Sequence, residues 1–243
     1  MDKKEKRFEE DIESSLLKSG YEKGDLKTYD RERAIDMPKL ITFIRKTQPK
    51  QWIRYTKIYG DSSENKLYRR FQDSVEVNGL LYVLRHGFKD RGVQFKVCAF
   101  KPNNGLSDKV MSDYDANILE VTRQFNYSTE NENSIDIVLL LNGIPIVALE
   151  LKDQLTGQSV ANAMRQWKED RNPRELCFHR DSRFLVYFAV DLYEVEMTTE
   201  LKGDATYFLP FNQGSNGAGN VGGAGNPENP NGYATAYLWE HVL

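Results

Sequence analysis

Apolar residues recur along the 243-residue chain with two different periods, and these periods predict its helices and strands. Spacings of three and four residues predict a short amphipathic helix over Lys4 to Lys18, a long helix over Asn65 to His86 and a third helix over Ser159 to Glu169. The span between the first two helices is polar and rich in turn residues, so no regular element is expected there.

Apolar runs and alternating apolar and polar positions predict the strands. They are expected at residues 93–100, 118–127, 135–141, 146–152, 183–190 and 193–199. Helices interspersed with such strands give an α/β class, in which helices flank a mixed central sheet.

Three charged residues interrupt two adjacent predicted strands. Asp136 begins the first apolar run, and Glu150 and Lys152 end the second. Burying these groups is costly unless they pair with one another or hold a cation. Glu150 and Lys152 are two residues apart on a strand and therefore project from one face, with Leu151 on the other.

The turn between these strands decides whether the two carboxylates share a face. A strict two-residue turn at residues 142–143 would place Asp136 opposite Leu149, on the face away from Glu150. One additional loop residue, or one β-bulge, would place Asp136 opposite Glu150. Pro145 favours such an irregularity, because it cannot donate a ladder hydrogen bond next to the turn.

An isolated Asp and Glu-x-Lys match is most often a strand cap and a solvated strand end, but here longer stretches carry a resemblance. They are FEEDIESSLLKSGY (8–21), NGIPIVALELK (142–152), RFLVYFAVDLYEVEMTT (183–199) and GNPENPNGYATAYLWEHVL (225–243). Together they resemble the N-terminal part of the R (restriction and motor) subunit of type I restriction-modification enzymes, a member of the PD-(D/E)xK nuclease superfamily.

The resemblance implies a PD-(D/E)xK restriction-endonuclease-like fold and Mg²⁺-dependent cleavage of double-stranded DNA. Asp136, Glu150 and the carbonyl of Leu151 would hold Mg²⁺, an ion that prefers oxygen ligands. Lys152 would orient the attacking water and stabilise charge at the phosphate. Glu10 on the first helix would stand behind the ligands or hold a metal-bound water; otherwise it is one of several solvated acids on a charged helix.

One position departs from the family pattern. The family follows its Glu-x-Lys with a helix carrying Gln-x-x-x-Tyr, and here Gln166 is in place but Asp170 stands where the tyrosine would be. The resemblance gives Gln166 a supporting role in the site, although on sequence alone it could equally be a solvated helix residue. Asp170 receives no role.

Composition agrees with a globular protein of the cytoplasm. With 40% hydrophobic residues, the chain can bury a substantial core. No apolar run can span a bilayer, and the N-terminus lacks the apolar core of a signal peptide. Cys98 and Cys177 are isolated from each other and from the histidines, which argues against a zinc site and a disulfide framework.

The formal net charge of −3 is unusual for a DNA-binding protein, whose affinity rests largely on neutralising phosphates. It fits a domain that receives its DNA from attached motor domains and partner subunits and has only a local basic groove. Two basic clusters are candidates for this groove. One consists of Arg165, Lys168, Arg171 and Arg174, and the other of Arg45, Lys46, Lys50 and Arg54 interleaved with Trp52 and Tyr55.

Residues 1–210 are expected to form the nuclease domain, and residues 211–243 a Gly/Asn/Pro-rich connection toward a motor domain. No GxxxxGK[ST] motif occurs, so ATP would act only through motor domains outside this chain. The resemblance adds the methyltransferase and specificity subunits of a type I complex as partners. The chain is therefore interpreted as a piece of a longer subunit.

Two other functions remain open at this point. The chain could be a nuclease-like docking module that contacts motor or methyltransferase subunits and cuts poorly alone, which the acidic balance and the missing tyrosine favour. It could also be a stand-alone repair or mobile-element nuclease of the same superfamily.

Overall fold

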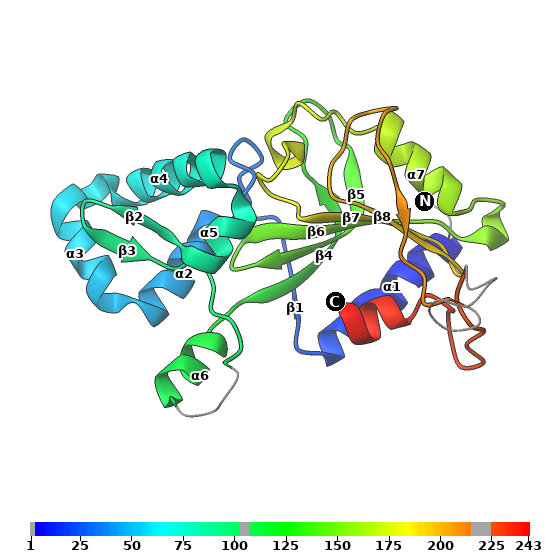
Figure 1. Cartoon of the computed structure of the whole chain (residues 1–243), viewed down its shortest axis with the longest axis horizontal. Helices are drawn as coiled ribbons and strands as arrows, with labels where there is room; N and C mark the ends of the chain where they lie inside the picture. The colour runs from blue at the N-terminus through cyan, green and yellow to red at the C-terminus, as the bar shows by residue number, and fades with distance from the viewer. Residues whose placement is uncertain (1–2, 103–106, 215–224) are drawn as a thin grey trace.

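A mixed β-sheet forms the centre of the molecule (Figure 1). The computed structural model describes residues 3–102, 107–214 and 225–243, and within them seven strands pair in the order β1-β4-β5-β6-β7-β8-β9. The pairs β1–β4 and β6–β7 are parallel, and the other neighbours are antiparallel. The strands are β1 Glu22–Lys23, β4 Leu119–Asn126, β5 Ser134–Leu141, β6 Ile144–Leu151, β7 Val186–Val190, β8 Val195–Thr198 and β9 Leu209–Pro210.

Helices cover both faces of this sheet, which confirms the expected α/β class (Figure 1). α1 (Lys3–Lys18) lies on one face and α7 (Val160–Glu169) on the other. The Trp167 indole of α7 donates a hydrogen bond to the carbonyl of Phe188 in β7 at 3.0 Å. Both helices were predicted from apolar stripes, and each stripe is buried against the sheet because an amphipathic helix removes its apolar face from water there.

The described end of the chain packs back onto α1. The ring centroid of Phe8 lies 4.7 Å from that of Tyr233 and 5.7 Å from that of Trp239. Leu238 between them in sequence is fully buried in the same apolar cluster. The described part of the expected connection 211–243 therefore shares a core with α1 and the sheet.

A helical lobe formed by residues 37–96 stands at one end of the sheet (Figure 1). It comprises α2 Met37–Thr47, α3 Pro49–Tyr59, α4 Ser63–Asn78, α5 Leu80–His86 and a hairpin of β2 Phe88–Asp90 and β3 Val93–Phe95, around an apolar core of its own. The remaining short elements are α6 Asp108–Tyr114, 3₁₀ turns at Gly60–Ser62, Gln154–Thr156 and Leu176–Phe178, and a π-helical turn at Leu238–Val242. No helix in the described ranges is long and apolar enough to cross a membrane.

The expectation of a polar span without regular elements before residue 65 was wrong, because α2 and α3 lie there. Asp36 caps α2 by accepting a hydrogen bond from the backbone N–H of Lys39 at 3.2 Å, and Pro38 occupies the first turn. Leu40 and Ile44 are buried on the inner face of this short helix. These start signals were present in the sequence, but charged residues between the apolar positions obscured the period.

The single long helix expected over 65–86 is two helices, because the chain turns at Gly79. Gly79 has φ +81°, and the backbone N–H of Leu80 donates to the carbonyl of Asp181 at 2.6 Å instead of continuing the helix. The break changes which residues face inward, and Leu81, just after it, is 46% exposed. The strand expected over 93–100 is also shorter, and β3 pairs only with β2.

The turn between β5 and β6 is a strict two-residue turn anchored to the helical lobe. Asn142 and Gly143 have φ +52° and +80°, the left-handed conformations that a primed hairpin turn requires. The buried Asn142 side chain accepts a hydrogen bond from the N–H of Ile118 at 2.7 Å and donates one to the carbonyl of Val97 at 2.8 Å. The carbonyl of Gly143 accepts from the N–H of Asp36 at 2.9 Å, next to the start of α2.

A bulge at Ile146 supplies the irregularity that the sequence required. Next to the turn Leu141 pairs with Ile144 and Leu140 with Pro145, but Leu139 then pairs with Val147. The shifted register continues to the pair Ile137 and Leu149. The predicted bulge is therefore present, and the ladder ends at the residues next to Asp136 and Glu150, so the two carboxylates lie at the same end of the strand pair.

The Gly143 position predicts a specific stability effect. A Cβ atom on Gly143 would lie 2.3 Å from the carbonyl oxygen of Asp36, whereas Gly157 has the same φ of +80° with nothing within 4 Å. Gly157→Ala should cost about 1 kcal/mol of unfolding free energy for its left-handed backbone. Gly143→Ala should cost about 1–3 kcal/mol more, because the methyl group also overlaps the start of α2. Urea unfolding of both variants measures the difference, and equal costs would contradict this view of the turn.

Candidate functional site

Asp136 binds the end of the strand that carries the second carboxylate. Its Oδ2 accepts a hydrogen bond from the backbone N–H of Leu151 at 2.7 Å, and its Oδ1 accepts from Nε2 of Gln124 at 3.2 Å. The backbone pairing of β5 with β6 ends at Ile137 and Leu149, so it does not include Asp136 and Glu150. The Asp136 carboxylate therefore replaces a backbone acceptor and fixes the end of β6 in place.

Glu150 is fully buried between the two apolar strands. Its Oε1 accepts a hydrogen bond from Nη2 of Arg171, and its Oε2 has no hydrogen-bond partner within the described part of the chain. Burial raises the pKa of the Glu150 carboxyl well above its usual range, and the charge of Asp136 raises it further, while Arg171 and Lys152 oppose the rise. A second cation beside Oε2 would stabilise the carboxylate.

The cation beside Glu150 comes from the residues that follow α7. Arg171 also donates to the hydroxyl of Tyr127 at 3.2 Å and to the carbonyl of Ser134 at 2.8 Å, and its guanidinium carbon lies 5.4 Å and 5.6 Å from the ring centroids of Tyr127 and Trp167. The sequence interpretation placed Arg171 in a basic surface groove. That was wrong, because the side chain is only 4% exposed and is committed to Glu150.

Lys152 lies at the edge of the same site. It is half-buried, and its backbone continues the pairing with β7 by donating its N–H to the carbonyl of Val190 at 2.9 Å. Its positive charge lowers the pKa of Glu150, against the effect of burial. The predicted Asp136, Glu150 and Lys152 are therefore brought together at one end of the β5–β6 pair.

The donor set fits a hard divalent cation. Two neighbouring carboxylates, one with a buried oxygen that lacks a hydrogen-bond partner among the described residues, are the kind of oxygen ligands that Mg²⁺ and Ca²⁺ bind. Across residues 3–102, 107–214 and 225–243, no group of three or more His, Cys, Asp or Glu side chains is arranged to hold a metal ion. A cation here would take the two carboxylates together with backbone oxygen and water.

One protein family matches the part of the chain that contains this site. The family model, described as "Type I restriction enzyme R protein N terminus", matches residues 9–216, which include Asp136, Glu150 and Lys152. The chain belongs to this family. The resemblance given by the sequence motifs is thereby confirmed. A comparison with curated proteins found no match.

The acid of α1 that lies next to Asp136 is Glu9. Glu10, to which the sequence interpretation gave that role, is half exposed and pairs with Arg123 at 3.5 Å. Glu9 is 1% exposed, and burial together with the charge of Asp136 raises its pKa to about 7. The reason lies in helix geometry. Successive side chains are about 100° apart around a helix, and the burial of Phe8 and Ile12 sets which acid faces the sheet.

Gln124 connects Glu9 to Asp136. Its Nε2 donates to Oε1 of Glu9 at 2.8 Å and to Oδ1 of Asp136 at 3.2 Å, and its Oε1 accepts from the Ser134 hydroxyl at 2.8 Å. Gln124 has φ +48° inside β4, a conformation that side-chain-bearing residues rarely adopt and that is often found at functional sites. Sequence reasoning missed this residue because nothing in an uninterrupted strand pattern marks the irregular backbone.

The irregularity at Gln124 switches the faces of the neighbouring residues. Val121 packs in the cluster on the α1 side of the sheet, whereas Phe125, an even number of residues later, packs on the α7 side. On β5, Ile137 and Ile135 are divided in the same way. Side chains from both layers of helices can therefore meet at this end of the sheet.

Among the described residues, Gln166 and Asp170 make no hydrogen bond or ion pair to the Asp136 or Glu150 carboxylate. Gln166 is half-buried on α7, and within the described residues its side chain has no hydrogen-bond partner. Asp170 is exposed at the end of the helix, where its backbone carbonyl accepts a long 3.5 Å hydrogen bond from Asn133. A phenol nevertheless reaches the site from another element, because the Tyr127 hydroxyl contacts Arg171.

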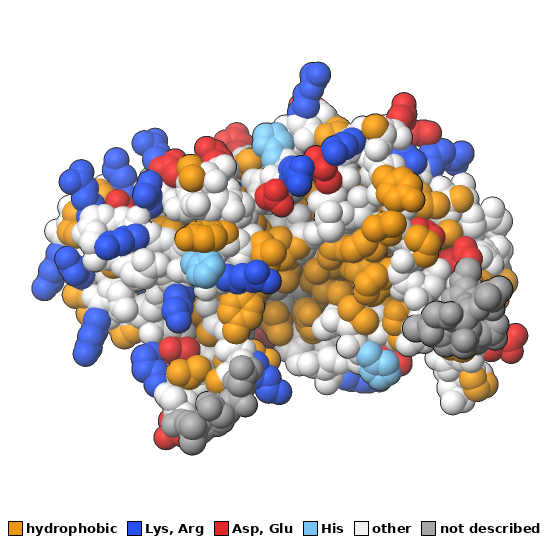
Figure 2. All heavy atoms as spheres, in the orientation of Figure 1, with side chains coloured by type: hydrophobic (Ala, Val, Ile, Leu, Met, Phe, Trp, Pro, Cys, Tyr) orange, Lys and Arg blue, Asp and Glu red, His pale blue; other side chains and the backbone are white. Residues whose placement is uncertain are grey.

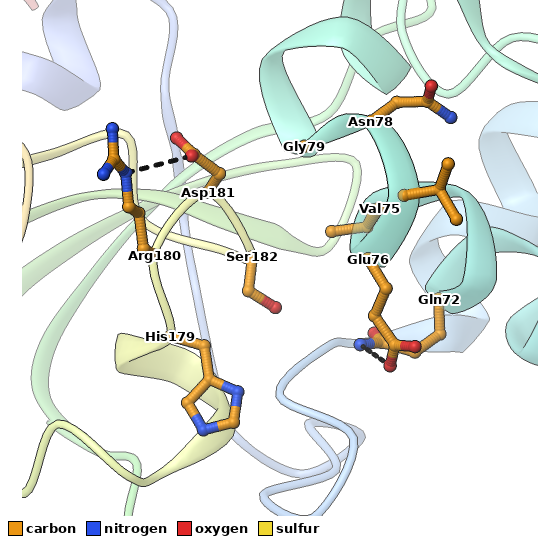
Figure 3. A pocket seen from close by; sticks show the side chains of 10 residues that line it. Gln72, Val75, Glu76, Asn78, Gly79, His179, Arg180, Asp181 and Ser182 are labelled. Atoms are coloured by element: carbon orange, nitrogen blue, oxygen red, sulfur yellow. Dashed lines mark hydrogen bonds and ion pairs between the residues drawn. The ribbon is translucent and has the colours of Figure 1, made fainter.

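A pocket of about 480 Å³ lies elsewhere, between the α4–α5 junction and residues 179–182 (Figure 3). Charged side chains that line it interact with their neighbours. Arg180 pairs with Asp181 at 3.3 Å, and Glu76 accepts a hydrogen bond from Gln72 at 3.0 Å. None of the predicted site residues lines it. The chemistry described above therefore does not extend into this pocket.

The raised pKa of Glu9 predicts a pH-dependent stability. Folding raises this pKa from 4.5 to about 7, so between these values the folded protein binds more protons than the unfolded chain, and the free energy of unfolding falls as pH rises. Glu9→Gln should remove this part of the decline, at most about 3 kcal/mol between pH 4.5 and 8. Urea unfolding in EDTA at pH 5 and pH 8 measures it.

The matched control changes the neighbouring acid. Glu10→Gln carries out the same substitution one residue along the helix and should keep the wild-type decline between pH 5 and pH 8. If Glu10→Gln, and not Glu9→Gln, flattened the decline, the assignment of Glu9 to the site would be wrong.

Proposed function

We propose that this chain is the Mg²⁺-dependent endonuclease part of a type I restriction enzyme, cleaving phosphodiester bonds of double-stranded DNA. Membership of the R protein N-terminal family supports the enzyme class. The observation that carries the chemistry is the proximity of Asp136 and Lys152 to the buried, incompletely paired Glu150, at the strand end whose register the bulge at Ile146 sets.

The residues that would hold the metal are Asp136, Glu150 and the carbonyl of Leu151. When bound, the ion supplies Lewis-acid polarisation of the scissile phosphate and a more acidic water. The free Oε2 of Glu150 is available for it, while Arg171 keeps Oε1 and thereby fixes the carboxylate's orientation.

Lys152 would act on the reacting phosphate and water. Its ammonium donates hydrogen bonds, so it can hold the attacking water in line and stabilise the charge that grows on the phosphate oxygens. Glu9, with its pKa near 7, can accept or hold a proton of an ordered water next to Asp136. Gln124 keeps the Glu9 and Asp136 carboxylates at a fixed separation. Gln166 would support the site from α7.

The partners follow from the enzyme class. We propose that the methyltransferase and specificity subunits of a type I complex select the DNA, and that ATP acts through motor domains outside this chain. Nothing in the Asp136 site is built to read a base sequence, because its polar groups are directed at one another and at the backbone.

A second candidate is a docking module with a nuclease-like fold. The ion pair between Arg171 and Glu150 favours it, because a built-in cation already balances part of the charge that a metal would balance. The aspartate at position 170 in place of the family tyrosine points the same way. The two experiments below separate these functions.

The metal site predicts a selective loss of cation binding. Asp136→Asn keeps an oxygen that can accept from the Leu151 N–H but removes a charge, so Mn²⁺ binding measured by calorimetry should weaken by at least about 100-fold. Asp170→Asn makes the same change at the exposed end of α7 and should bind Mn²⁺ like the wild type. Equal heats from wild type and Asp136→Asn would reject this metal site.

The role of Lys152 predicts a loss of cleavage without a loss of metal binding. Lys152→Ala should reduce plasmid cleavage by about 10²–10³-fold, the effect of removing one donor to a developing charge, and leave Mn²⁺ binding in place. In an assembled type I enzyme, ATP hydrolysis should be retained. A docking module predicts the reverse, with cleavage unaffected by Lys152→Ala and subunit assembly disturbed by surface substitutions.

A further inference from the structure

The charges of this chain are divided very unevenly between its two parts. The helical lobe, residues 37–96, contains 13 Lys and Arg and 5 Asp and Glu, a formal charge of +8, while the rest contains 20 and 31, a formal charge of −11. The overall charge of −3 is therefore the sum of a basic helical lobe and an acidic remainder of the chain. Figure 2 shows Lys and Arg side chains gathered over the end of the molecule formed by the lobe.

The basic side chains of the lobe are accessible. All but one of them are exposed, and on α3 they form a line at spacings of four and three residues, which places them on one face of the helix. We name this line the α3 stripe; it consists of Lys50, Arg54 and Lys57. The opposite face of α3 is fixed to the lobe by Trp52 and Tyr55, which are buried and cannot stack on a nucleic-acid base.

The acids of the lobe do not neutralise the α3 stripe. Asp90 accepts hydrogen bonds from the hydroxyls of Tyr55 and Tyr59, both at 2.9 Å, and Glu64 pairs with Arg45 at 3.4 Å. Within the described residues no carboxylate lies within ion-pair distance of the stripe. Its charge is therefore directed to solvent or to an anionic partner.

The lobe lies at a fixed distance from the candidate site. The N–H of Asp36 at the start of α2 donates to Gly143, so the lobe begins at the turn of the β5–β6 pair. Asp136 lies six residues before Asn142 on β5, which at 3.4 Å per residue is roughly 20 Å. This is the distance from the site to the near edge of the lobe, and α3 lies beyond that edge, toward the end of the molecule (Figure 1).

We propose that the helical lobe binds the phosphate backbone of duplex DNA, with the α3 stripe as a contact, on the same duplex that the candidate site would cleave. The inference rests on the proposed nuclease function for the identity of the substrate. Lys and Arg that neutralise phosphates release bound counterions, so such binding is independent of base sequence and strongly dependent on salt.

The other basic cluster, which consists of Arg165, Lys168, Arg171 and Arg174, is a weaker candidate for binding DNA. Arg171 is buried against Glu150, which leaves Arg165, Lys168 and Arg174, and this group is flanked by the acids Glu169 and Asp170. The lobe has no comparable balance of charge. The two surfaces can nevertheless be compared directly, because each offers three basic residues for the same substitution.

The test measures DNA binding separately from cleavage. Binding of a fluorescent 30-base-pair duplex to the 243-residue chain is followed by anisotropy in EDTA between about 50 and 200 mM salt. Lys50→Gln, Arg54→Gln and Lys57→Gln together should weaken binding at every salt concentration. They should also make the slope of log K against log salt shallower by about 3, near 0.9 for each phosphate that is no longer neutralised. A duplex of unrelated sequence should give the same change.

Two matched triple variants locate the effect. Replacing Lys18, Lys27 and Lys202 by Gln removes the same charge from exposed positions outside the lobe and should leave the slope unchanged. Replacing Arg165, Lys168 and Arg174 by Gln tests the other cluster. An unchanged slope for the stripe variant, as expected if the lobe instead binds an acidic protein, overturns the proposal, and so does an equal loss in the Lys18, Lys27 and Lys202 variant.

The result is distinguishable from a failure of the proposed function. If the stripe variant loses DNA binding and the wild type never cleaves DNA, the lobe is a DNA-binding surface on a docking module. If Lys152→Ala abolishes cleavage but the stripe variant binds normally, the nuclease stands and the lobe proposal is wrong. Circular dichroism confirms that each variant is folded.

Discussion

The register of one pair of strands controls the rest of this structure. A tight turn at Asn142 and Gly143 alone would direct Glu150 away from Asp136, but the extra residue at Ile146 reverses that. The turn must stay tight because its two residues are packed against Val97 and Asp36, which flank the helical lobe, and the register shift must therefore occur within the strand. One bulge therefore allows both tight packing at the turn and the close approach of Asp136 and Glu150 at the other end of the strand pair.

The buried charges follow from that register. Once Glu150 is buried close to Asp136, its carboxylate needs a cation, and Arg171, just after the end of α7, meets this need with its guanidinium next to the rings of Tyr127 and Trp167. Replacing one half of such a pair leaves an uncompensated charge, which is far more destabilising than losing a surface pair. The site is therefore part of the stability of the fold as well as of its chemistry.

Local patterns were sufficient for the central elements and for three site residues. The apolar periods predicted α1, α7 and the strands β4 to β7, and the charged interruptions identified Asp136, Glu150 and Lys152. Pro145 even indicated that the turn could not be followed by a regular ladder. These features depend on neighbours within a few residues, which is the range that a sequence pattern records.

Features that depend on distant packing were not accessible in the same way. Whether Glu9 or Glu10 faces the sheet depends on how α1 rotates to bury Phe8, and whether Arg171 is exposed depends on a carboxylate 21 residues earlier. The left-handed conformation of Gln124 likewise occurs together with side-chain contacts to Glu9, Asp136 and Ser134, which lie on other elements. The division of charge between the two parts was present in the sequence, but its meaning required the boundaries of the lobe.

The attachment of the chain's end to α1 has a mechanical consequence. Phe8 packs against Tyr233 and Trp239, the Tyr233 hydroxyl donates to Asp11 at 2.6 Å, and the Tyr21 hydroxyl donates to the carbonyl of Leu243 at 3.4 Å. A displacement of residues 233–243 would be transmitted to α1 through these contacts, and to the end of β7 through the hydrogen bond from Thr235 to the carbonyl of Asp191. Because α1 also carries Glu9, such a displacement would also shift this carboxylate relative to Asp136.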